Sequence, residues 1–513
     1  MKKVKFLPLL LALLFALSIL SGCKKSNIDL GEGSADEEWF YEDDPNNPEG
    51  GDTEGGEPGA ASNAAESGSP NSKKSNTTAD KAKEPTGDKT TAPPVEDLKD
   101  YQFVIAVGNQ YGDPTPMKLG QSDYIDAVLA RNAKIQKDYN VKIVYDYYNP
   151  ATFADTATAA IASGNKFADL MIVKLFAAGA MFSKDLLYTY EQLPAVKMNE
   201  RHWNQEFFNA SKLKRGTFAG ECQINKNYGG GIFYNKDIIS SRSDLPDPAD
   251  LVKADNWNWT TFKDFVSKAA VDRNGDGIFD DNDLWATTGA TYEGLVPFFL
   301  SSGVNVFSKS ADLSVKYNLS SQQALTTLST FKSLFSTPGA HYTVNWDYDN
   351  NVSMFLKGNA VLFIGDTYDL FESSFALGYV PFPKGPGMKN YTANLRQNNS
   401  ALCVPKSIKN PQTTSLVLEA LAVESVKEYD LWVNQTAQQF RDPTAVKMFK
   451  DFIMPNPKVE VTQFFQGITL NTFNGTSCVI GNPIFNDQLE VAPMIKSFES
   501  LCQGDINTIC NTK

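Results

Sequence analysis

Apolar runs and amphipathic segments alternate where the globular part of the chain begins. Apolar runs predict buried strands at residues 101–107, 141–147 and 168–176. Amphipathic segments predict helices between them, at residues 122–140 and 153–161. The order strand, helix, strand, helix, strand is typical of a parallel, doubly wound α/β sheet, which binds ligands at the carboxyl ends of its strands.

The N-terminus has the pattern of an export signal. Basic residues precede an apolar run from Phe6 to Leu20, which is too short to predict a membrane span and favours a cleaved signal peptide over residues 1–22. The sequence Leu-Ser-Gly-Cys that ends it resembles the lipobox of bacterial lipoproteins. This resemblance implies lipidation of Cys23 and a membrane anchor on the extracellular face, the alternative being an ordinary signal peptide with a chance cysteine.

The amino-acid composition is distinctive between residues 23 and 98. This segment is acidic and rich in Gly, Ser and Pro, with too little apolar surface to offset the entropy of ordering, so we predict a disordered tether. About 415 residues follow, which is long for a single core and favours two domains or lobes. The net charge of -13 argues against a nucleic-acid partner.

Cysteine spacing suggests no disulfide framework or zinc site. Five cysteines remain beyond Cys23, an odd number without a CxxC motif, although Cys502 and Cys510 could close a small loop. The two histidines, His202 and His341, stand in no catalytic motif, and we expect surface or structural roles for them.

Several segments follow one another in the order found in one family. In chain order they are SGNKFADLMIV, GGGIFYNKDII, TYEGLVPFFLSSGVNVFS, MFLKGNAVLFIGDTYDL and ALGYVPFPKGPG, and together they resemble the bacterial extracellular solute-binding proteins of family 1, the maltose-binding-protein-like group. The resemblance implies a type II periplasmic-binding-protein-like α/β fold with a ligand cleft between two lobes. It also implies a monomer that binds a solute, most often a carbohydrate, and delivers it to the permease subunits of an ABC importer.

Lobe boundaries follow from the crossovers that this fold implies. We expect the chain to cross near residues 218–221, to return near 378–381 and to cross again near Leu402. The N-terminal lobe would then hold residues 99–219 plus 381–401. The C-terminal lobe would hold residues 220–380 plus 402–513.

Ligand contacts are expected where strands end at the cleft. Such a cleft needs aromatic faces and polar groups that bind hydroxyls. The candidates are Asn109, Gln110, Tyr111, Lys174, Phe176, Asp366, Tyr368, Arg396 and Gln397, with Asn398 beside them. Trp257 and Trp259 precede Thr260, a predicted N-cap, and we interpret them as packing at a helix start.

The main rival is a lipid-anchored enzyme that acts on glycans, such as a glycosidase. A glycosidase needs only two suitably spaced carboxylates, which 60 Asp and Glu residues cannot exclude. The sequence has no GxSxG elbow, no HExxH helix and no P-loop, and we favour a protein that is not an enzyme.

The sequence VDRNGDGIFDDNDLW has the oxygen-ligand spacing of a calcium loop. Its ligands would be Asp272, Asn274, Asp276, the Ile278 carbonyl, Asp280 and Asp283. A helix is predicted before the loop and none after it, so the paired helices that convert calcium binding into an opening motion are missing. We therefore expect a structural Ca²⁺ site, with an unmetallated acidic loop as the alternative.

Overall fold

The structure of the protein is a computed structural model. It describes residues 91–108, 117–289, 294–342, 348–365, 368–455, 457–469, 480–481 and 489–512. The predicted signal peptide, Cys23 and nearly all of the tether lie outside these residues. No helix within the described ranges is long and apolar enough to cross a membrane.

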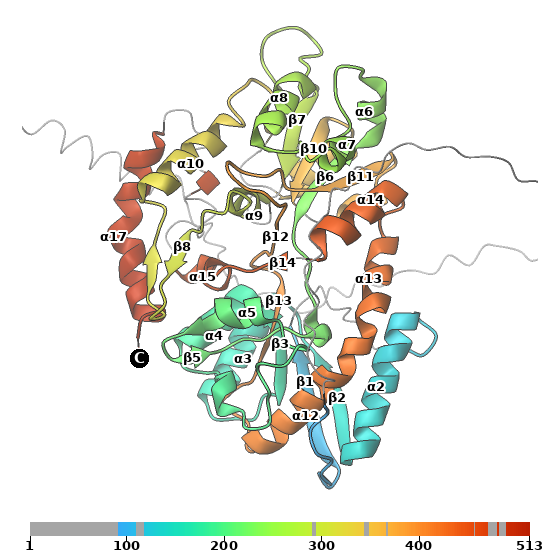
Figure 1. Cartoon of the computed structure of the whole chain (residues 1–513), viewed down its shortest axis with the longest axis vertical. Coiled ribbons are helices and arrows are strands. Elements are labelled where there is room, and N and C mark those ends of the chain that lie inside the picture. The colour runs from blue at the N-terminus through green and yellow to red at the C-terminus, as the bar shows by residue number, and fades with distance from the viewer. Residues whose placement is uncertain are drawn as a thin grey trace, which may run out of the picture. The chain divides into compact units, whose positions relative to one another are not determined.

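The first lobe is built on a four-stranded sheet in the order β13-β3-β1-β2 (Figure 1). Strands β1 (Tyr101–Val107), β2 (Val141–Tyr147) and β3 (Leu170–Lys174) are parallel, and β13 (Ser400–Cys403) joins antiparallel to β3. The predicted parallel arrangement of the first three strands is confirmed. The third strand is shorter than predicted.

Helix α4 (Leu175–Ser183) explains the short third strand. Its sequence, LFAAGAMFS, is almost wholly buried, so it lacks the polar positions that would have shown a helical period. The strand predicted to reach Phe176 therefore ends at Lys174. The preceding helices were predicted correctly: α3 spans Phe153–Ala162, and α2 (Asp123–Tyr139) begins at Ser122, whose hydroxyl accepts the Ile125 N–H.

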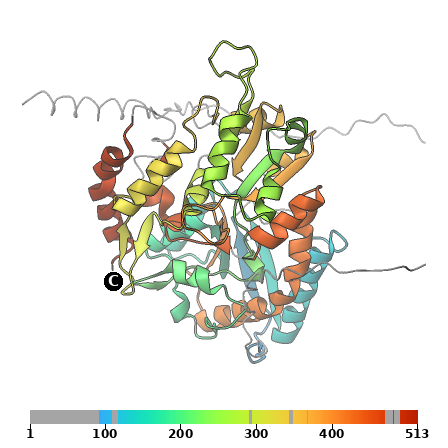
Figure 2. The same ribbon diagram turned by 45° about the horizontal axis from the view of Figure 1, so that its top comes forward.

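The second lobe is built on a sheet in the order β11-β6-β10-β7. Strands β6 (Gly231–Asn235), β7 (Trp285–Gly289), β10 (Ala360–Gly365) and β11 (Leu377–Pro381) form it, with β10 parallel to β7 and antiparallel to β6. The two sheets occupy separate parts of the ribbon (Figures 1 and 2). Helices α6 (Lys236–Ser241), α7 (Pro248–Lys253), α8 (Trp259–Ala269), α9 (Val296–Leu300), α10 (Gln322–Ser333) and α11 (Tyr348–Leu356) belong to this part of the chain.

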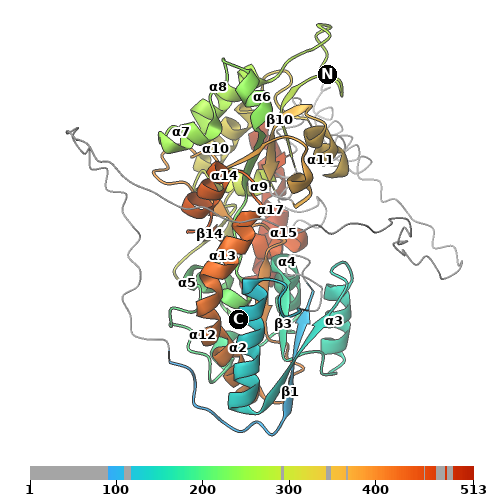
Figure 3. The same cartoon turned by 90° about the vertical axis from the view of Figure 1, so that its right-hand side faces the viewer.

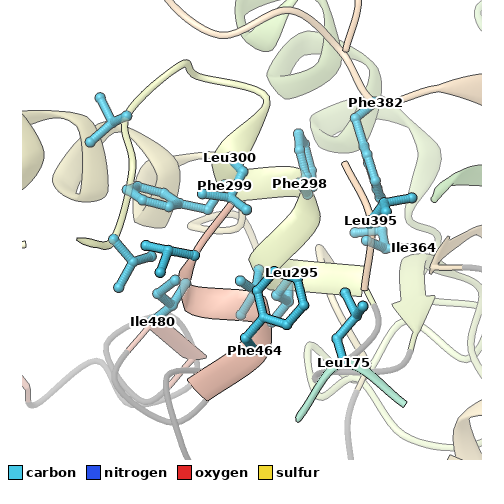
Figure 4. Packing of buried hydrophobic residues seen from close by; sticks show 14 of the residues in the cluster. Leu175, Leu295, Phe298, Phe299, Leu300, Ile364, Phe382, Leu395, Phe464 and Ile480 are labelled. Carbon is cyan, nitrogen blue, oxygen red and sulfur yellow. The ribbon is translucent and has the colours of Figure 1, made fainter. Parts of the chain in front are cut away.

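Aromatic packing holds the second lobe together. Phe298 on α9 stacks on Phe382 with ring centroids 5.4 Å apart, and Leu395 lies beside them (Figure 4). Trp257 and Trp259 are buried at the start of α8, as the packing interpretation predicted. The N-cap is Asn258 and not Thr260, because the Asn258 side chain accepts the N–H groups of residues 260 and 261.

The chain after residue 381 departs from the predicted lobe boundaries. Residues 382–394 stay with the second lobe, where the Lys384 ammonium pairs with Asp255 at 2.6 Å. Leu402 lies inside β13 of the first sheet, and α12 (Pro411–Ser425) then packs on α2 (Figures 1 and 3). The predicted crossover at Leu402 is therefore wrong, since the apolar face of α12 completes the first lobe's core.

The C-terminal helices contact both lobes. They are α13 (Tyr429–Gln438), α14 (Pro443–Met448), α15 (Thr462–Thr469) and α17 (Val491–Ile509). Helix α14 packs on β11 of the second lobe, whereas α15 packs on α4 of the first. Helix α17 returns to β9 (Val315–Tyr317) and α10. The predicted assignment of residues 402–513 to one lobe is thus wrong in this region too.

Cys502 and Cys510 do not form the disulfide that remained open on sequence grounds. Both thiols are free and buried. Cys502 lies within α17 and Cys510 caps its end. An offset of eight positions along the helix separates them by about 12 Å, which is beyond the reach of a disulfide.

Candidate functional site

A cavity of about 470 Å³ lies at the carboxyl ends of the first lobe's strands. Val107 ends β1, Tyr147 ends β2, and both line it. The remaining wall comes from α2, from α13 and from two crossover segments, residues 224–228 and 396–400. The full lining comprises Val107, Met117, Tyr124, Ile125, Val128, Arg131, Tyr145, Tyr147, Ile172, Ile224, Asn225, Lys226, Asn227, Tyr228, Arg396, Asn399, Ser400, Trp432, Gln435, Thr436 and Gln439.

Amide side chains join the two crossover segments at the floor of the cavity. The Asn227 amide donates to the Ser400 carbonyl at 2.9 Å, and its oxygen accepts the Ser400 N–H at 2.8 Å. Asn225 donates to the same carbonyl at 3.2 Å. Next to this floor, the backbones of Gly220 and Leu402 exchange two hydrogen bonds. Side-chain donors and acceptors at the floor are therefore held in fixed orientations before any ligand binds.

Two residues just outside the cavity explain why the groups at its floor are held in fixed orientations. Glu221 is fully buried, and one of its oxygens accepts both the backbone N–H and the side-chain amide of Asn227, at 2.9 and 2.8 Å. Its other oxygen accepts from the Asn204 amide. Gly229 follows the segment, and a Cβ there would collide with the backbone of Ala393. The crossover can pack this closely only because residue 229 is a glycine.

A buried ion pair forms one wall. Arg131 of α2 donates from Nη1 to Glu428 Oε2 at 2.8 Å, and both side chains are at least 96% buried. The guanidinium also donates to Asn132 Oδ1 at 3.1 Å and to the Tyr145 hydroxyl at 3.3 Å. Burial raises the pKa of Glu428 to about 7, against the opposing effect of Arg131. This network fixes the rings and amides of the wall in place.

Helix α13 presents one face to the cavity. Trp432, Gln435, Thr436 and Gln439, spaced by three, four and seven residues, line it together. The Trp432 ring lies 6.3 Å from that of Tyr228 on the crossover segment. The Gln435 side chain also reaches the Ser122 hydroxyl, with an Oγ–Oε1 distance of 2.7 Å. Aromatic faces and planar amides thus meet across the cavity.

The chemistry of the lining is that of a binding site. Five aromatic rings offer faces for stacking, and its amides and hydroxyls offer both donors and acceptors. Among the described lining residues none is Asp, Glu or His.

The predicted site residues lie in different places in the structure. Arg396 lines the cavity and is 2% exposed. Three other candidates lie together at the junction of β3 and α4: Lys174, Phe176 and Gln397. There the Phe176 N–H donates to the Gln397 carbonyl at 3.4 Å. The cavity lining includes none of these three residues and does not include Asn398. Asn109, Gln110, Tyr111, Asp366 and the Tyr368 side chain lie outside the described residues.

The sequence interpretation missed most of the lining. The spacing of Trp432, Gln435 and Gln439 marks a polar and aromatic helix face and could have indicated it. The amides of Asn225 and Asn227 carried a weaker signal, since their segment follows the predicted first crossover. Nothing in the sequence could have indicated Arg131, because its position looks like any charged residue on an amphipathic helix.

The predicted calcium loop is a well-formed turn between α8 and β7. Asp272 accepts the N–H groups of Gly275 and Gly277, each at 2.7 Å. Asp283 is fully buried, and its two oxygens accept the N–H groups of Arg273 and Asp280, each at 2.9 Å. No three His, Cys, Asp or Glu side chains come close enough to hold a metal ion anywhere in the described ranges. In this arrangement the carboxylates serve the loop's own backbone.

The sequence decides the family. The model of the family described as bacterial extracellular solute-binding protein matches residues 120–428, which is more than half of the chain. The chain belongs to this family. The cavity of this solute-binding protein lies largely within the matched range, although Trp432 and the rest of the α13 face lie just beyond it. No curated protein matches the sequence.

Solved structures are similar to this solute-binding protein, and the first of those named next shares its fold. A cyclo/maltodextrin-binding protein complexed with maltotetraose is 12% identical, covers 80% of this chain and 98% of its own, and has a TM-score of 0.53. The maltotriose-binding protein of Thermus thermophilus is 15% identical over 79% of this chain and 100% of its own, with a TM-score of 0.49. The GacH receptor of Streptomyces glaucescens is 12% identical over 80% and 99%, with a TM-score of 0.49.

Proposed function

We propose that this solute-binding protein captures a carbohydrate in the 470 Å³ cavity and delivers it to the permease of an ABC importer. One observation carries the proposal: aromatic rings from four segments and the side-chain amides of Gln435 and Gln439 line a single cavity of ligand size. Sugars present apolar ring faces and dense hydroxyls, which such rings and amides complement. The sugar ligand of the cyclo/maltodextrin-binding protein supports the same solute class.

The anchoring part of the proposal rests on the N-terminal sequence. We infer that the chain is processed at the lipobox and held on the outer face of the membrane by a diacylglycerol at Cys23, acting as a monomer. The acidic segment up to residue 98 would then separate the two lobes from the membrane. Metabolic labelling with a radioactive fatty acid, with Cys23→Ala as the control, tests the anchor.

Isothermal titration calorimetry with a panel of mono- and oligosaccharides, amino acids and short peptides tests the solute class. We expect heat with one class of sugar and none with the amino acids or peptides. Binding of amino acids alone would contradict the carbohydrate proposal. Chromatography of the recovered ligand distinguishes the alternative, a glycan-active enzyme, because an enzyme would return a cleaved sugar.

Calcium at residues 272–283 is proposed as a separate, structural feature. Its support is the ligand spacing, the exposure of Asn274, Asp276 and Asp280 to solvent, and the carboxylate lone pairs that one N–H per oxygen leaves free at Asp272. A calcium ion would bring together oxygen ligands that now point to backbone N–H groups. Calorimetric titration with Ca²⁺ tests this directly.

A further inference from the structure

A second cavity, of about 510 Å³, lies beside the solute cavity. Its walls are the start of α2, one face of α13, and the segment that runs from α14 to residue 450. Helices α2 and α13 contact each other and lie side by side (Figures 1 and 3). The volume falls within the range of small-molecule sites, and we refer to this space as the outer cavity.

The two cavities share part of their lining. Tyr124 of α2 and Gln435 of α13 line both, so the wall between the cavities is a single residue thick at these two positions. The Ser122 hydroxyl donates to Gln435 Oε1 at 2.7 Å and joins the two helices at the same place. Gln435 is exposed, so its side chain can shift without disturbing the core. A solute that fills the solute cavity can therefore continue into the outer cavity.

Two amides of the outer cavity have their oxygens engaged. Ser122 donates to Gln435 Oε1, and the Lys450 ammonium donates to Asn434 Oδ1 at 2.8 Å. The side-chain N–H groups of Gln435 and Asn434 make no hydrogen bond to any described residue. Because each oxygen is occupied, these N–H groups are the part of each amide that remains for a solute. The α13 face therefore offers oriented donors to hydroxyl oxygens.

The rest of the outer cavity suits a neutral solute rich in hydroxyls. Asp123 contributes an exposed carboxylate, which accepts hydrogen bonds from hydroxyl groups. Lys450 is the one basic residue in the described lining, so the two formal charges cancel. Apolar surface for the face of a sugar ring comes from Leu431, Val446 and the half-buried Tyr124.

We propose that the solute is an oligosaccharide whose inner units occupy the solute cavity and whose outer units occupy the outer cavity. This inference rests on the proposed carbohydrate function and adds the length of the sugar and the path that it follows. The outer units would accept hydrogen bonds from the amides of Asn434 and Gln438 and donate to Asp123, and the sugar chain would pass over Gln435. Affinity should therefore rise with the length of the sugar, because each outer unit adds hydrogen bonds.

Calorimetric titration of the whole protein with sugars of increasing length tests this proposal. The probes are malto-, cello-, xylo- and chito-oligosaccharides of two to five units. We expect one series to bind, and its four-unit member to bind at least about tenfold more tightly than its two-unit member. Equal affinity at all lengths would overturn the oligosaccharide proposal and leave the carbohydrate function standing. Binding of no series would contradict the carbohydrate function itself.

Variants on α13 test the position of the outer units. Asn434→Ala combined with Gln438→Ala removes two amides that line the outer cavity and not the solute cavity. We expect about tenfold weaker binding of the four-unit sugar, and affinity for the two-unit sugar within about twofold of the parent's. Gln323→Ala removes an exposed amide on α10, outside both linings, and should change neither affinity.

Two results with the double variant would overturn the proposed path. Unchanged affinity for the four-unit sugar would show that the outer units lie elsewhere. An equal loss of affinity for both sugars would show that the two substitutions act through the solute cavity and not through the outer one.

Discussion

Arg131 and Glu428 lie 297 positions apart in the sequence and form a buried ion pair at 2.8 Å. Arg131 comes from α2 and lines the solute cavity, and Glu428 ends the 3₁₀ turn between α12 and α13. The pair therefore joins the first lobe's opening βα unit to the helix that carries Trp432 and Gln435.

Removing one partner of this ion pair should destabilise the protein more than replacing both partners with apolar residues. Arg131→Met leaves Glu428 buried without its counter-ion, and we expect a loss of about 3–5 kcal/mol in the free energy of unfolding, measured by urea denaturation at pH 8. The double variant Arg131→Met, Glu428→Leu removes both charges and should regain most of that loss. A double variant as unstable as the single one would show that packing, and not charge, is the cause.

The stability of the protein should also depend on pH through Glu428. Its folded pKa of about 7 lies above the ordinary value of 4.5, because burial disfavours the carboxylate. Its contribution to stability is therefore fully present below pH 4.5 and is lost as pH rises through 7. Unfolding free energies measured at pH 5 and pH 8 for the parent and for Glu428→Gln check this. The fall in unfolding free energy between the two pH values should be smaller in the variant, because it has no carboxyl group at this position.

Solute affinity should depend on the face of α13. Trp432→Ala removes a ring opposite Tyr228 and should weaken carbohydrate binding by about 2 kcal/mol, or roughly thirtyfold, in calorimetry. Trp285→Ala, at the start of β7 and outside the lining, is the matched control and should bind as the parent does. If Trp432→Ala binds the carbohydrate with the parent's affinity, the solute binds outside this cavity.

The acidic loop should affect stability and not solute binding. If Ca²⁺ binds, Asp272→Ala combined with Asp276→Ala should remove the calcium-dependent part of the melting temperature and leave carbohydrate affinity nearly unchanged. The parent in chelator provides the comparison: the double variant should melt below it, because it also loses the Asp272 hydrogen bonds to Gly275 and Gly277, and its melting temperature should be the same in calcium and in chelator. A large loss of solute affinity would contradict a purely structural role.

Several local elements and the fold class could be predicted from the amino-acid pattern alone. The apolar run at 101–107, the helix that Ser122 caps and the strand at 141–147 were predictable because their burial follows one period and their caps are local. Helix α4 was not, because burial on all sides removes the polar positions that reveal a helical period.

The lobe boundaries and the cavity depend on how the elements pack against one another. Helix α12 belongs to the first lobe because its apolar face completes that lobe's core, a choice that no local pattern records. In the same way, Arg131, Asn227, Ser400 and Trp432 meet only after the crossovers bring together segments more than 300 positions apart. Periodicity in a sequence reports burial along one element, whereas a site depends on contacts between elements, and those contacts are set only when the lobes fold.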